Sequence, residues 1–334
     1  MNHKGDMPIA DTVRLNSGFE MPVVAFGTWQ IPRSIAAERV REALEAGYRH
    51  IDCALSFKNQ PEIGAGIQEW CKIRKVRREE LFLSSKIWNT FHSRAKCMEQ
   101  VDMMLEDFNT RYMDLVVIHW PFGWAEDEPG ERGMWPRGND GKFRKSEIDF
   151  LETWTALEDI HRTGKIRAIG LANFSLEQVD RIYTKGLIKP CVLQVEMNPY
   201  FSQIPMRKYC KERGIILVAH MVTGNPSSAF YRKHEDPNLL HNETICSIGR
   251  LCGKTTTQIL LRWVIDSGHC AIIKSVEPKR IRQNLNIFKF YLIPEYMERI
   301  DALNMNFRIL NPILGNEDHP YYPWPYRPVK TEAE

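Results

Sequence analysis

Residues 51–58 read Ile-Asp-Cys-Ala-Leu-Ser-Phe-Lys, and this stretch decides how the rest of the chain is interpreted. It begins inside an apolar run, Arg49–Asp52, that has the length and character of a short buried strand. The run ends on a carboxylate, Asp52, and five positions later stands an aromatic ring without a hydroxyl, Phe57. A charged side chain that closes a buried strand predicts a functional group at the edge of a sheet.

Outward from this stretch, short apolar runs alternate with segments of helical period. The strand-like runs are 23–26, 49–52, 81–86, 115–119, 167–170, 192–195, 215–219 and 270–273, and the helical segments include 36–46, 97–108, 150–162, 176–184 and 281–288. Residues 12–21 precede them with the pattern of a β-hairpin. The pattern predicts the α/β class and a (β/α)8 TIM barrel. A doubly wound sheet is the alternative, but no GxGxxG motif follows the first strand.

Composition predicts a soluble globular protein. At 334 residues the chain could form one large domain or two ordinary ones, and the alternation favours one barrel domain across residues 1–334. The chain is 43% hydrophobic and 26% charged, with a formal net charge of +3 and both signs interspersed. This balance argues against nucleic-acid or membrane partners. The 8 cysteines form no CxxC pair, which is typical of reduced thiols in the cytosol. Residues 1–11 form a polar tail without a signal-peptide pattern. The sequence shows no long exposed apolar stripe of the kind that forms an obligate interface, which favours a monomer.

Two stretches interrupt the alternation, at 122–145 and at 303–334. Both are irregular and rich in aromatic residues, as in the run His319-Pro320-Tyr321-Tyr322-Pro323-Trp324. Long loops inside a compact domain are usually functional or disordered. The aromatic content favours ordered loops that cover the active-site face.

Polar residues close most of the strand-like runs. The set is Asp52, Lys86, His119, Asn173, Gln194, His220 and Lys274. Each of them alone would more often be a satisfied buried group or a rim residue. In a barrel, however, the carboxyl ends of the strands meet at one face, where active sites lie. Donors gathered there suit hydride transfer to a carbonyl, because negative charge develops on the carbonyl oxygen.

Several motifs resemble the aldo-keto reductase family, and of that family most closely the aldose and aldehyde reductases. They include Gly47–Asp52, Ser85–Trp88, Val117–Pro121 and Leu260–Trp263, and the resemblance extends over nearly the whole chain. It implies reduction of small carbonyl substrates with NADP(H). By this resemblance Asp52, Lys86 and His119 occupy three of the four catalytic positions, and Phe57 occupies the fourth.

At the position of Phe57 the family has a tyrosine that protonates the carbonyl oxygen. Loss of a general acid costs on the order of 10²–10⁴ in rate. We expect the Ser56 side chain to point away from the site, which leaves protonated His119 or a water molecule as substitute donors. Two interpretations follow: a slow reductase with an altered mechanism, and a non-catalytic protein that binds NADP(H) or a partner on the same barrel.

The resemblance also implies a cofactor site. Its predicted residues are Gly27, Thr28, Trp29, Asn173, Gln194 and His220 around the nicotinamide, and Lys274, Ser275, Arg280, Gln283 and Asn284 around the adenosine phosphate. The chain departs from the family at Ala172, His220 and Met221, where serine, tyrosine and serine are usual. Two cations beside a hydroxyl suit a phosphate dianion and favour NADP(H) over NAD(H). The alternative is that the basic residues near 280 form an ordinary solvated helix face.

The predicted substrate pocket is apolar, with Trp29, Trp120 and Trp124 as its walls beside Phe57. Such a pocket suits an aldehyde or ketone with an apolar body. For Trp124, a place in the core is an equally open interpretation.

Overall fold

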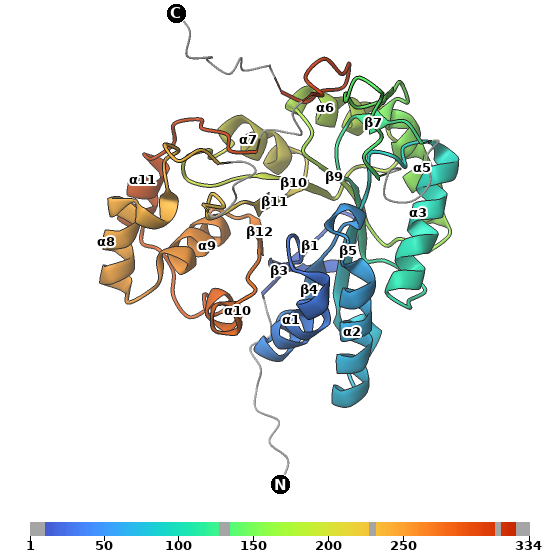
Figure 1. Ribbon diagram of the computed structural model, residues 1–334. Coiled ribbons are helices and arrows are strands. Elements are labelled where there is room, and N and C mark those ends of the chain that lie inside the picture. The colour runs from blue at the N-terminus through green and yellow to red at the C-terminus, as the bar shows by residue number, and fades with distance from the viewer. Residues whose placement is uncertain (1–10, 127–133, 227–231, 311–314, 325–334) are drawn as a thin grey trace, which may run out of the picture.

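The computed structural model describes residues 11–126, 134–226, 232–310 and 315–324 (Figure 1). The expected polar tail at 1–10 lies outside the described residues. So do residues 127–133 of the first aromatic stretch, and residues 311–314 and 325–334 of the second.

The described chain forms a closed parallel barrel, as the alternation predicts. Its strands, in the order in which they pair around the barrel from the first, are β3 (Val24–Gly27), β4 (His50–Asp52), β5 (Phe82–Ile87), β6 (Leu115–Ile118), β9 (Ile169–Ala172), β10 (Val192–Glu196), β11 (Ile216–His220) and β12 (Cys270–Ile273). β12 pairs with β3 and closes the ring. Since all pairings are parallel, the carboxyl ends of these strands lie at one face.

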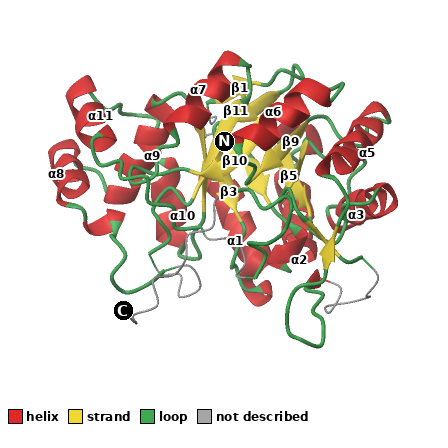
Figure 2. Cartoon of the chain, turned by 90° about the horizontal axis from the view of Figure 1, so that it is seen from above, coloured by secondary structure: helices red, strands yellow, loops and turns green. Residues whose placement is uncertain are grey.

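Helices surround the strands on the outside (Figure 2). They are α1 (Arg33–Ala46), α2 (Gln60–Arg74), α3 (Arg94–Asp107), α5 (Phe150–Arg162), α6 (Leu176–Lys185), α7 (Ile204–Glu212), α8 (Glu243–Cys252), α9 (Thr256–Asp266), α10 (Pro278–Leu285) and α11 (Pro294–Asp301). Most of them follow a barrel strand and return the chain to the next one. α8 and α11 stand outside this alternation and pack against each other.

Glycines explain why α2 was not recognised from its sequence. A Cβ at Gly64 would lie 1.9 Å from the backbone oxygen of Asp107, and one at Gly66 would lie 2.6 Å from that of Ala37. Glycine lowers helix propensity, yet here it allows α2 to approach its neighbours α1 and α3 closely. Tertiary packing therefore stabilises α2, although its glycines lower its intrinsic helix propensity.

The N-terminal hairpin is present as predicted. β1 (Thr12–Arg14) pairs antiparallel with β2 (Glu20–Pro22). Leu15 and Met21 are buried together with Leu115, Val192 and Val218 of the barrel strands. The hairpin thus covers the apolar interior of the barrel at its amino-terminal end.

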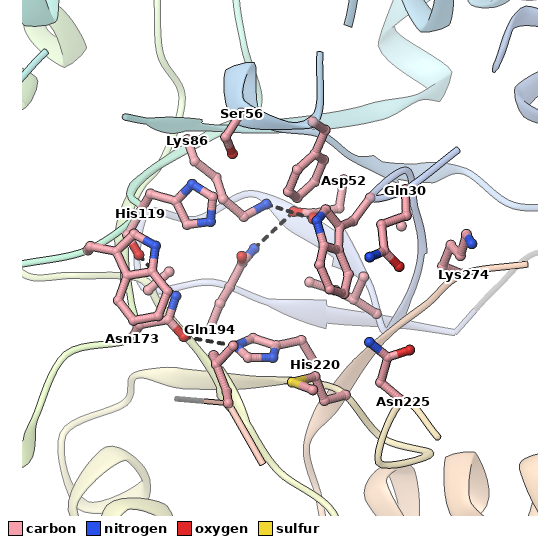
Figure 3. Close-up of a pocket in the computed structure, with 18 of the residues that line it drawn as sticks. Gln30, Asp52, Ser56, Lys86, His119, Asn173, Gln194, His220, Asn225 and Lys274 are labelled. Carbon is pink, nitrogen blue, oxygen red and sulfur yellow. Dashed lines mark hydrogen bonds and ion pairs between the residues drawn. The ribbon is translucent and has the colours of Figure 1, made fainter. Parts of the chain in front are cut away.

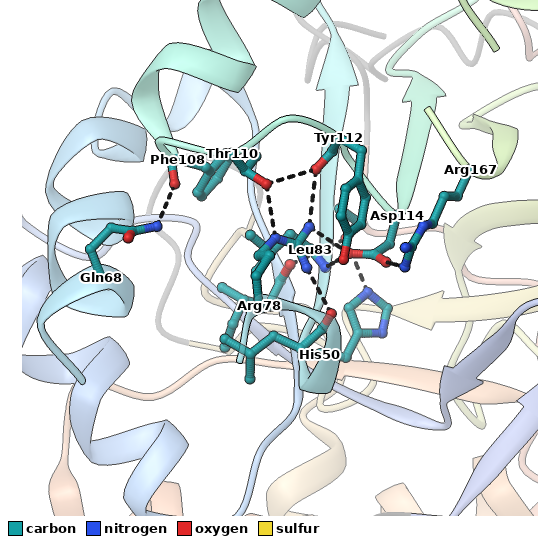
Figure 4. Close-up of polar contacts among 12 residues, drawn as sticks. His50, Gln68, Arg78, Leu83, Phe108, Thr110, Tyr112, Asp114 and Arg167 are labelled. Carbon is teal, nitrogen blue, oxygen red and sulfur yellow. Dashed lines mark hydrogen bonds and ion pairs between the residues drawn. The ribbon is translucent and has the colours of Figure 1, made fainter. Parts of the chain in front are cut away.

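A polar cluster lies at the same amino-terminal end (Figure 4). The carboxylate of Asp114 accepts hydrogen bonds from Nη2 of Arg78 (2.7 Å) and from the backbone N–H of Leu83 (2.9 Å), and Arg167 lies 3.3 Å away. The ring of Tyr112 lies under both guanidinium groups, 4.5 Å from Arg78 and 3.6 Å from Arg167. In barrels this face serves stability, whereas function resides at the opposite face.

Aromatic side chains gather at the opposite, carboxyl-terminal face. The cluster contains Trp88, Trp120, Phe122, Trp124 and Phe143, with Trp135, Tyr321, Tyr322 and Trp324 packed against it. The described parts of the two irregular stretches meet here, since the ring centroids of Phe122 and Tyr322 lie 6.4 Å apart. Short strands β7 (Gly123–Trp124) and β8 (Lys145–Ser146) hold the first stretch as a hairpin.

Candidate functional site

A cavity of about 270 Å³ opens at the carboxyl-terminal face of the barrel (Figure 3). Its walls come from the ends of barrel strands and from the loops that follow them. The lining residues include Gly27, Trp29, Gln30, Asp52, Ser56, Phe57, Lys86, Trp88, His119, Trp120, Trp135, Ala172, Asn173, Gln194, His220, Met221, Asn225, Lys274 and Leu310. All seven polar residues that close the strand-like runs are therefore brought together.

Asp52 and Lys86 form a buried ion pair on the inner wall. Nζ of Lys86 donates to Oδ2 of Asp52 at 2.6 Å and to the backbone oxygen of Cys53 at 2.9 Å. Oδ1 of Asp52 accepts from the Ser84 hydroxyl (3.0 Å) and from Nε2 of Gln194 (3.2 Å). Four hydrogen bonds thus converge on the Asp52 carboxylate and the Cys53 carbonyl. They fix both charges, and removing one partner of such a pair typically costs about 3–5 kcal/mol.

His119 is a neutral imidazole enclosed by aromatic rings. Its ring centroid lies 5.2 Å from that of Trp88 and 6.1 Å from that of Phe57. Burial holds the pKa of His119 well below its usual range, and the charge of Lys86 lowers it further. Nδ1 of His119 has no hydrogen-bond partner among the described residues. The neutral ring can donate a hydrogen bond to a carbonyl oxygen, but an imidazolium proton donor is disfavoured at neutral pH.

Ser56 is placed differently from the expectation. Its side chain lines the cavity, and Figure 3 shows the hydroxyl directed toward the interior where Lys86 and His119 lie. The reason is local: Leu55–Phe57 form a 3-10 turn, which rotates successive side chains by about a third of a revolution instead of alternating them. Both Ser56 and Phe57 therefore reach the cavity.

Asn173, His220 and Gln194 line the wall beside the ion pair. Nε2 of His220 donates to Oδ1 of Asn173 at 2.9 Å, and Nδ2 of Asn173 donates to the backbone oxygen of His119 at 3.0 Å. Burial lowers the pKa of His220 to about 3, so this ring is also neutral. Oε1 of Gln194, in contrast, is buried without a partner among the described residues. It is an acceptor that a ligand amide could satisfy.

Two of the residues that follow strands have left-handed backbones. Asn173 has φ 61° directly after β9, and Met221 has φ 53° directly after β11. Asparagine tolerates this region, whereas methionine carries a strain of about 1–3 kcal/mol. The conformation turns the chain sharply at the strand end, and both side chains line the cavity.

The predicted cofactor residues divide into two groups. Gly27, Trp29, Asn173, Gln194, His220 and Lys274 line the cavity, whereas Thr28, Ser275, Arg280, Gln283 and Asn284 do not. The hydroxyl of Thr28 is fully buried and donates to the backbone oxygen of Asp52. That of Ser275 accepts from the backbone N–H of Glu277 at 3.0 Å. Arg280 is exposed on α10, beyond Lys274 at the end of β12.

Of the predicted substrate-pocket residues, Trp29 and Trp120 line the cavity and Trp124 does not. Trp124 is fully buried, stacks on Phe143 and donates to Oδ1 of Asn316 at 2.8 Å. Its place is behind the wall, next to Trp88, because β7 directs the ring into the aromatic cluster. The prediction that Trp124 lines the pocket therefore needs correction.

Some wall residues were missed from the sequence. Trp88 stands two positions after Lys86 and could have been found by that spacing. Trp135 and Leu310 come from the irregular stretches, where no pattern indicates a direction. Leu310 is held by Glu196, whose buried carboxylate accepts from the backbone N–H groups of Ile309 (2.8 Å) and Leu310 (2.6 Å). These two bonds fasten the segment 305–310 to the end of β10.

Comparison with known proteins decides the family. The sequence model of the Aldo/keto reductase family matches residues 23–305. This chain belongs to the aldo/keto reductase family. It is 36% identical over 325 residues to Aldo-keto reductase family 1 member A1 of Rattus norvegicus, covering 94% of this chain and 98% of that protein. The Gallus gallus protein of that name is 37% identical over 326 residues, covering 94% and 97%.

A solved structure agrees with this assignment. The Bombyx mori aldo-keto reductase, crystallised in complex with NADP, superposes with a TM-score of 0.85 at 32% identity. The match covers 94% of this chain and 99% of that protein. In the part of the chain that our structure describes, no helix is long and apolar enough to cross a membrane.

Proposed function

We propose that this protein is an NADP(H)-dependent reductase of aldehydes and ketones, slow because Phe57 lacks a hydroxyl. The observation that supports it best is the convergence of the Asp52–Lys86 pair and His119 on one aromatic cavity. Membership in the family, whose relative from Bombyx mori binds NADP, supports the choice of cofactor. We further propose that the protein acts in the cytosol as a monomeric single-domain barrel, with the described parts of 122–145 and 303–334 covering the site.

The residues present fit a nicotinamide dinucleotide. The unpaired Oε1 of Gln194 can accept from a carboxamide N–H₂. A Cβ at Gly27 would lie 2.8 Å from Cγ2 of Ile272, so glycine allows these two wall residues to pack closely. Lys274 is half-buried at the rim, and desolvation lowers its pKa. A bound anion would offset this desolvation by stabilising the charged form. When bound, reduced nicotinamide supplies a hydride to the carbonyl carbon.

The chain's own residues prepare the carbonyl oxygen for reduction. Lys86 brings a positive charge to the inner wall, and Asp52 holds that charge in place at 2.6 Å. The neutral ring of His119 can donate a hydrogen bond to the same oxygen. Trp29, Phe57 and Trp120 exclude water, which strengthens these electrostatic interactions. The apolar walls select aldehydes and ketones with an apolar body.

A specific observation favours a second candidate function, an NADP(H)-binding or interaction protein without turnover. Asn173 already bonds with His220 and His119 through its two amide atoms, so its capacity for a ligand amide is reduced. Together with the missing hydroxyl of Phe57, this supports a site that binds the cofactor without turnover. The adenosine side could then bind a dinucleotide that is never oxidised.

Cofactor titration separates these possibilities. NADPH should quench the fluorescence of Trp29, Trp88 and Trp120 and bind at least tenfold more tightly than NADH, because Lys274 and Arg280 attract the additional phosphate. Binding together with oxidation of NADPH by an apolar aldehyde supports the reductase. Binding without oxidation supports the second function, and equal or absent binding of both nucleotides contradicts the cofactor assignment.

A further inference from the structure

Lys86 brings one unused N–H bond to the inner wall of the cavity. An ammonium group has three donors. Oδ2 of Asp52 and the backbone oxygen of Cys53 accept two of them, at 2.6 and 2.9 Å, and the third has no partner among the described residues. The side chain is 6% exposed, and the residue lines the cavity. The third N–H bond is therefore available to a ligand oxygen.

Few other side chains near Lys86 can donate a proton to a ligand oxygen in the cavity. Among the described residues that line the cavity, the only other cationic side chain is Lys274 at the rim. His119 is neutral because its ring is desolvated. The Phe57 ring lies 5.3 Å from Nζ of Lys86 and attracts the ammonium group through its face. Phe57, which has no hydroxyl proton to donate, thus lies next to Lys86, whose third N–H bond has no acceptor among the described residues.

We propose that Lys86 is the proton donor of the reduction and takes over the task of the missing phenol at position 57. This inference rests on the proposed reductase function. As hydride reaches the carbonyl carbon, the π electron pair of the C=O bond moves onto oxygen. The free Nζ–H bond breaks, its electron pair stays on nitrogen, and the proton joins oxygen to give the alcohol.

The resulting neutral amine fits the same contacts. It keeps two N–H bonds, which are those that Asp52 and the backbone of Cys53 already accept. A proton from water then restores the ammonium group.

Amine rescue tests the donor role directly. Lys86→Ala should lower kcat for an electron-poor aromatic aldehyde at least a hundredfold. Ethylamine, 2-fluoroethylamine and 2,2-difluoroethylamine, added as ammonium ions at equal concentration, should restore turnover to extents that follow their acidity. A structural role predicts rescue that follows size alone, and equal rescue by all three ions would overturn the proposal.

Two further variants distinguish charge from proton donation. Lys86→Arg keeps a cation that does not release its proton, so it should lose at least a hundredfold in kcat; a loss below threefold overturns the proposal. Ser56→Ala removes the other hydroxyl near Phe57 and should lose less than tenfold. A hundredfold loss in Ser56→Ala would assign the donor to Ser56 instead.

Benzoate binding gives a readout without turnover. Its carboxylate should accept from the third N–H bond of Lys86, so Lys86→Ala should weaken benzoate binding at least tenfold in a tryptophan fluorescence titration, while Lys86→Arg retains it within threefold. If Lys86→Ala binds benzoate as tightly as the wild type does, the third N–H bond of Lys86 does not reach a ligand oxygen. This result would overturn the proposal even if the wild type is active. Lys86-dependent benzoate binding without any NADPH oxidation by the wild type would instead refute the reductase function, and the donor role with it.

Discussion

The ammonium nitrogen of Lys86 lies 5.3 Å from the centre of the Phe57 ring, on the inner wall of the cavity. If the aldo-keto reductases have a tyrosine at this position, as the resemblance of residues 51–58 implies, the lysine would be positioned to activate its phenol. Here the buried Asp52–Lys86 pair is intact, and the group it would activate is missing. The surrounding structure therefore suits a phenol that residue 57 does not supply.

Glu196 should control the segment that carries Leu310 into the cavity wall. In Glu196→Gln the amide offers one oxygen, so one of the N–H groups of Ile309 and Leu310 loses its acceptor, at a cost of about 1–3 kcal/mol. We expect faster hydrogen exchange in the segment 305–310 and a larger change in KM for bulky aldehydes than for small ones. Glu298→Gln, at an exposed position of α11, is the control. Unchanged exchange in 305–310 would show that Glu196 does not hold the segment.

His92 should make the stability of the protein depend on pH. The ring is fully buried, neither ring nitrogen has a partner among the described residues, and burial lowers its pKa to about 3. The unfolded chain takes up this proton below about pH 6.5, whereas the folded chain does not. Stability is therefore complete above that pH and falls as the pH is lowered toward 3, by about 2 kcal/mol between pH 7 and pH 5.

Urea unfolding of His92→Phe at several pH values measures this contribution. The phenyl ring has nearly the same shape and no polar atoms, so the variant should equal or exceed the wild type in stability at pH 7. Between pH 7 and pH 5 its free energy of unfolding should also fall by about 2 kcal/mol less than that of the wild type. The exposed His234→Gln variant should keep the wild-type slope. An unaltered slope in His92→Phe would mean that this ring is protonated, or hydrated, in the folded protein.

The amino-terminal cluster should contribute to stability without affecting the cavity. Asp114→Ala leaves Arg78 and Arg167 without their shared carboxylate and should lower the free energy of unfolding by about 2–4 kcal/mol. Asp102→Ala removes an exposed pair with Lys165 and should change it by less than about 0.5 kcal/mol. NADPH affinity should be the same in both variants. A stability loss in Asp114→Ala no larger than that of its control would contradict the assigned role.

The fold was predictable because its signals are local and repeated. The predicted bounds hold for Phe150–Arg162, which has an amphipathic period, and for Cys270–Ile273, which is a short apolar run. The strand-end rule also led to Asp52, Lys86 and His119, because parallel strands bring their carboxyl ends together. Such signals require only neighbours within a few positions.

What could not be predicted depends on contacts between distant parts of the chain. The bond from Glu196 to Ile309 joins residues 113 positions apart, and nothing near Leu310 indicates that it reaches the cavity. Trp124 and Trp135 are both tryptophans of one irregular stretch, yet only Trp135 lines the cavity. The prediction that Ser56 points away from the site is wrong because Leu55–Phe57 form a 3-10 turn, which brings Ser56 to the cavity.

The most direct measurement is NADPH oxidation at 340 nm with a panel of aldehydes and ketones, comparing the wild type with Phe57→Tyr. We predict weak but measurable turnover in the wild type and at least a tenfold higher kcat in the variant, because the new phenol would stand beside the Asp52–Lys86 pair. Unchanged tryptophan quenching by NADPH would confirm that both proteins bind the cofactor alike. The account is contradicted if the wild type turns over and Phe57→Tyr does not increase kcat. It is also contradicted if neither protein oxidises NADPH.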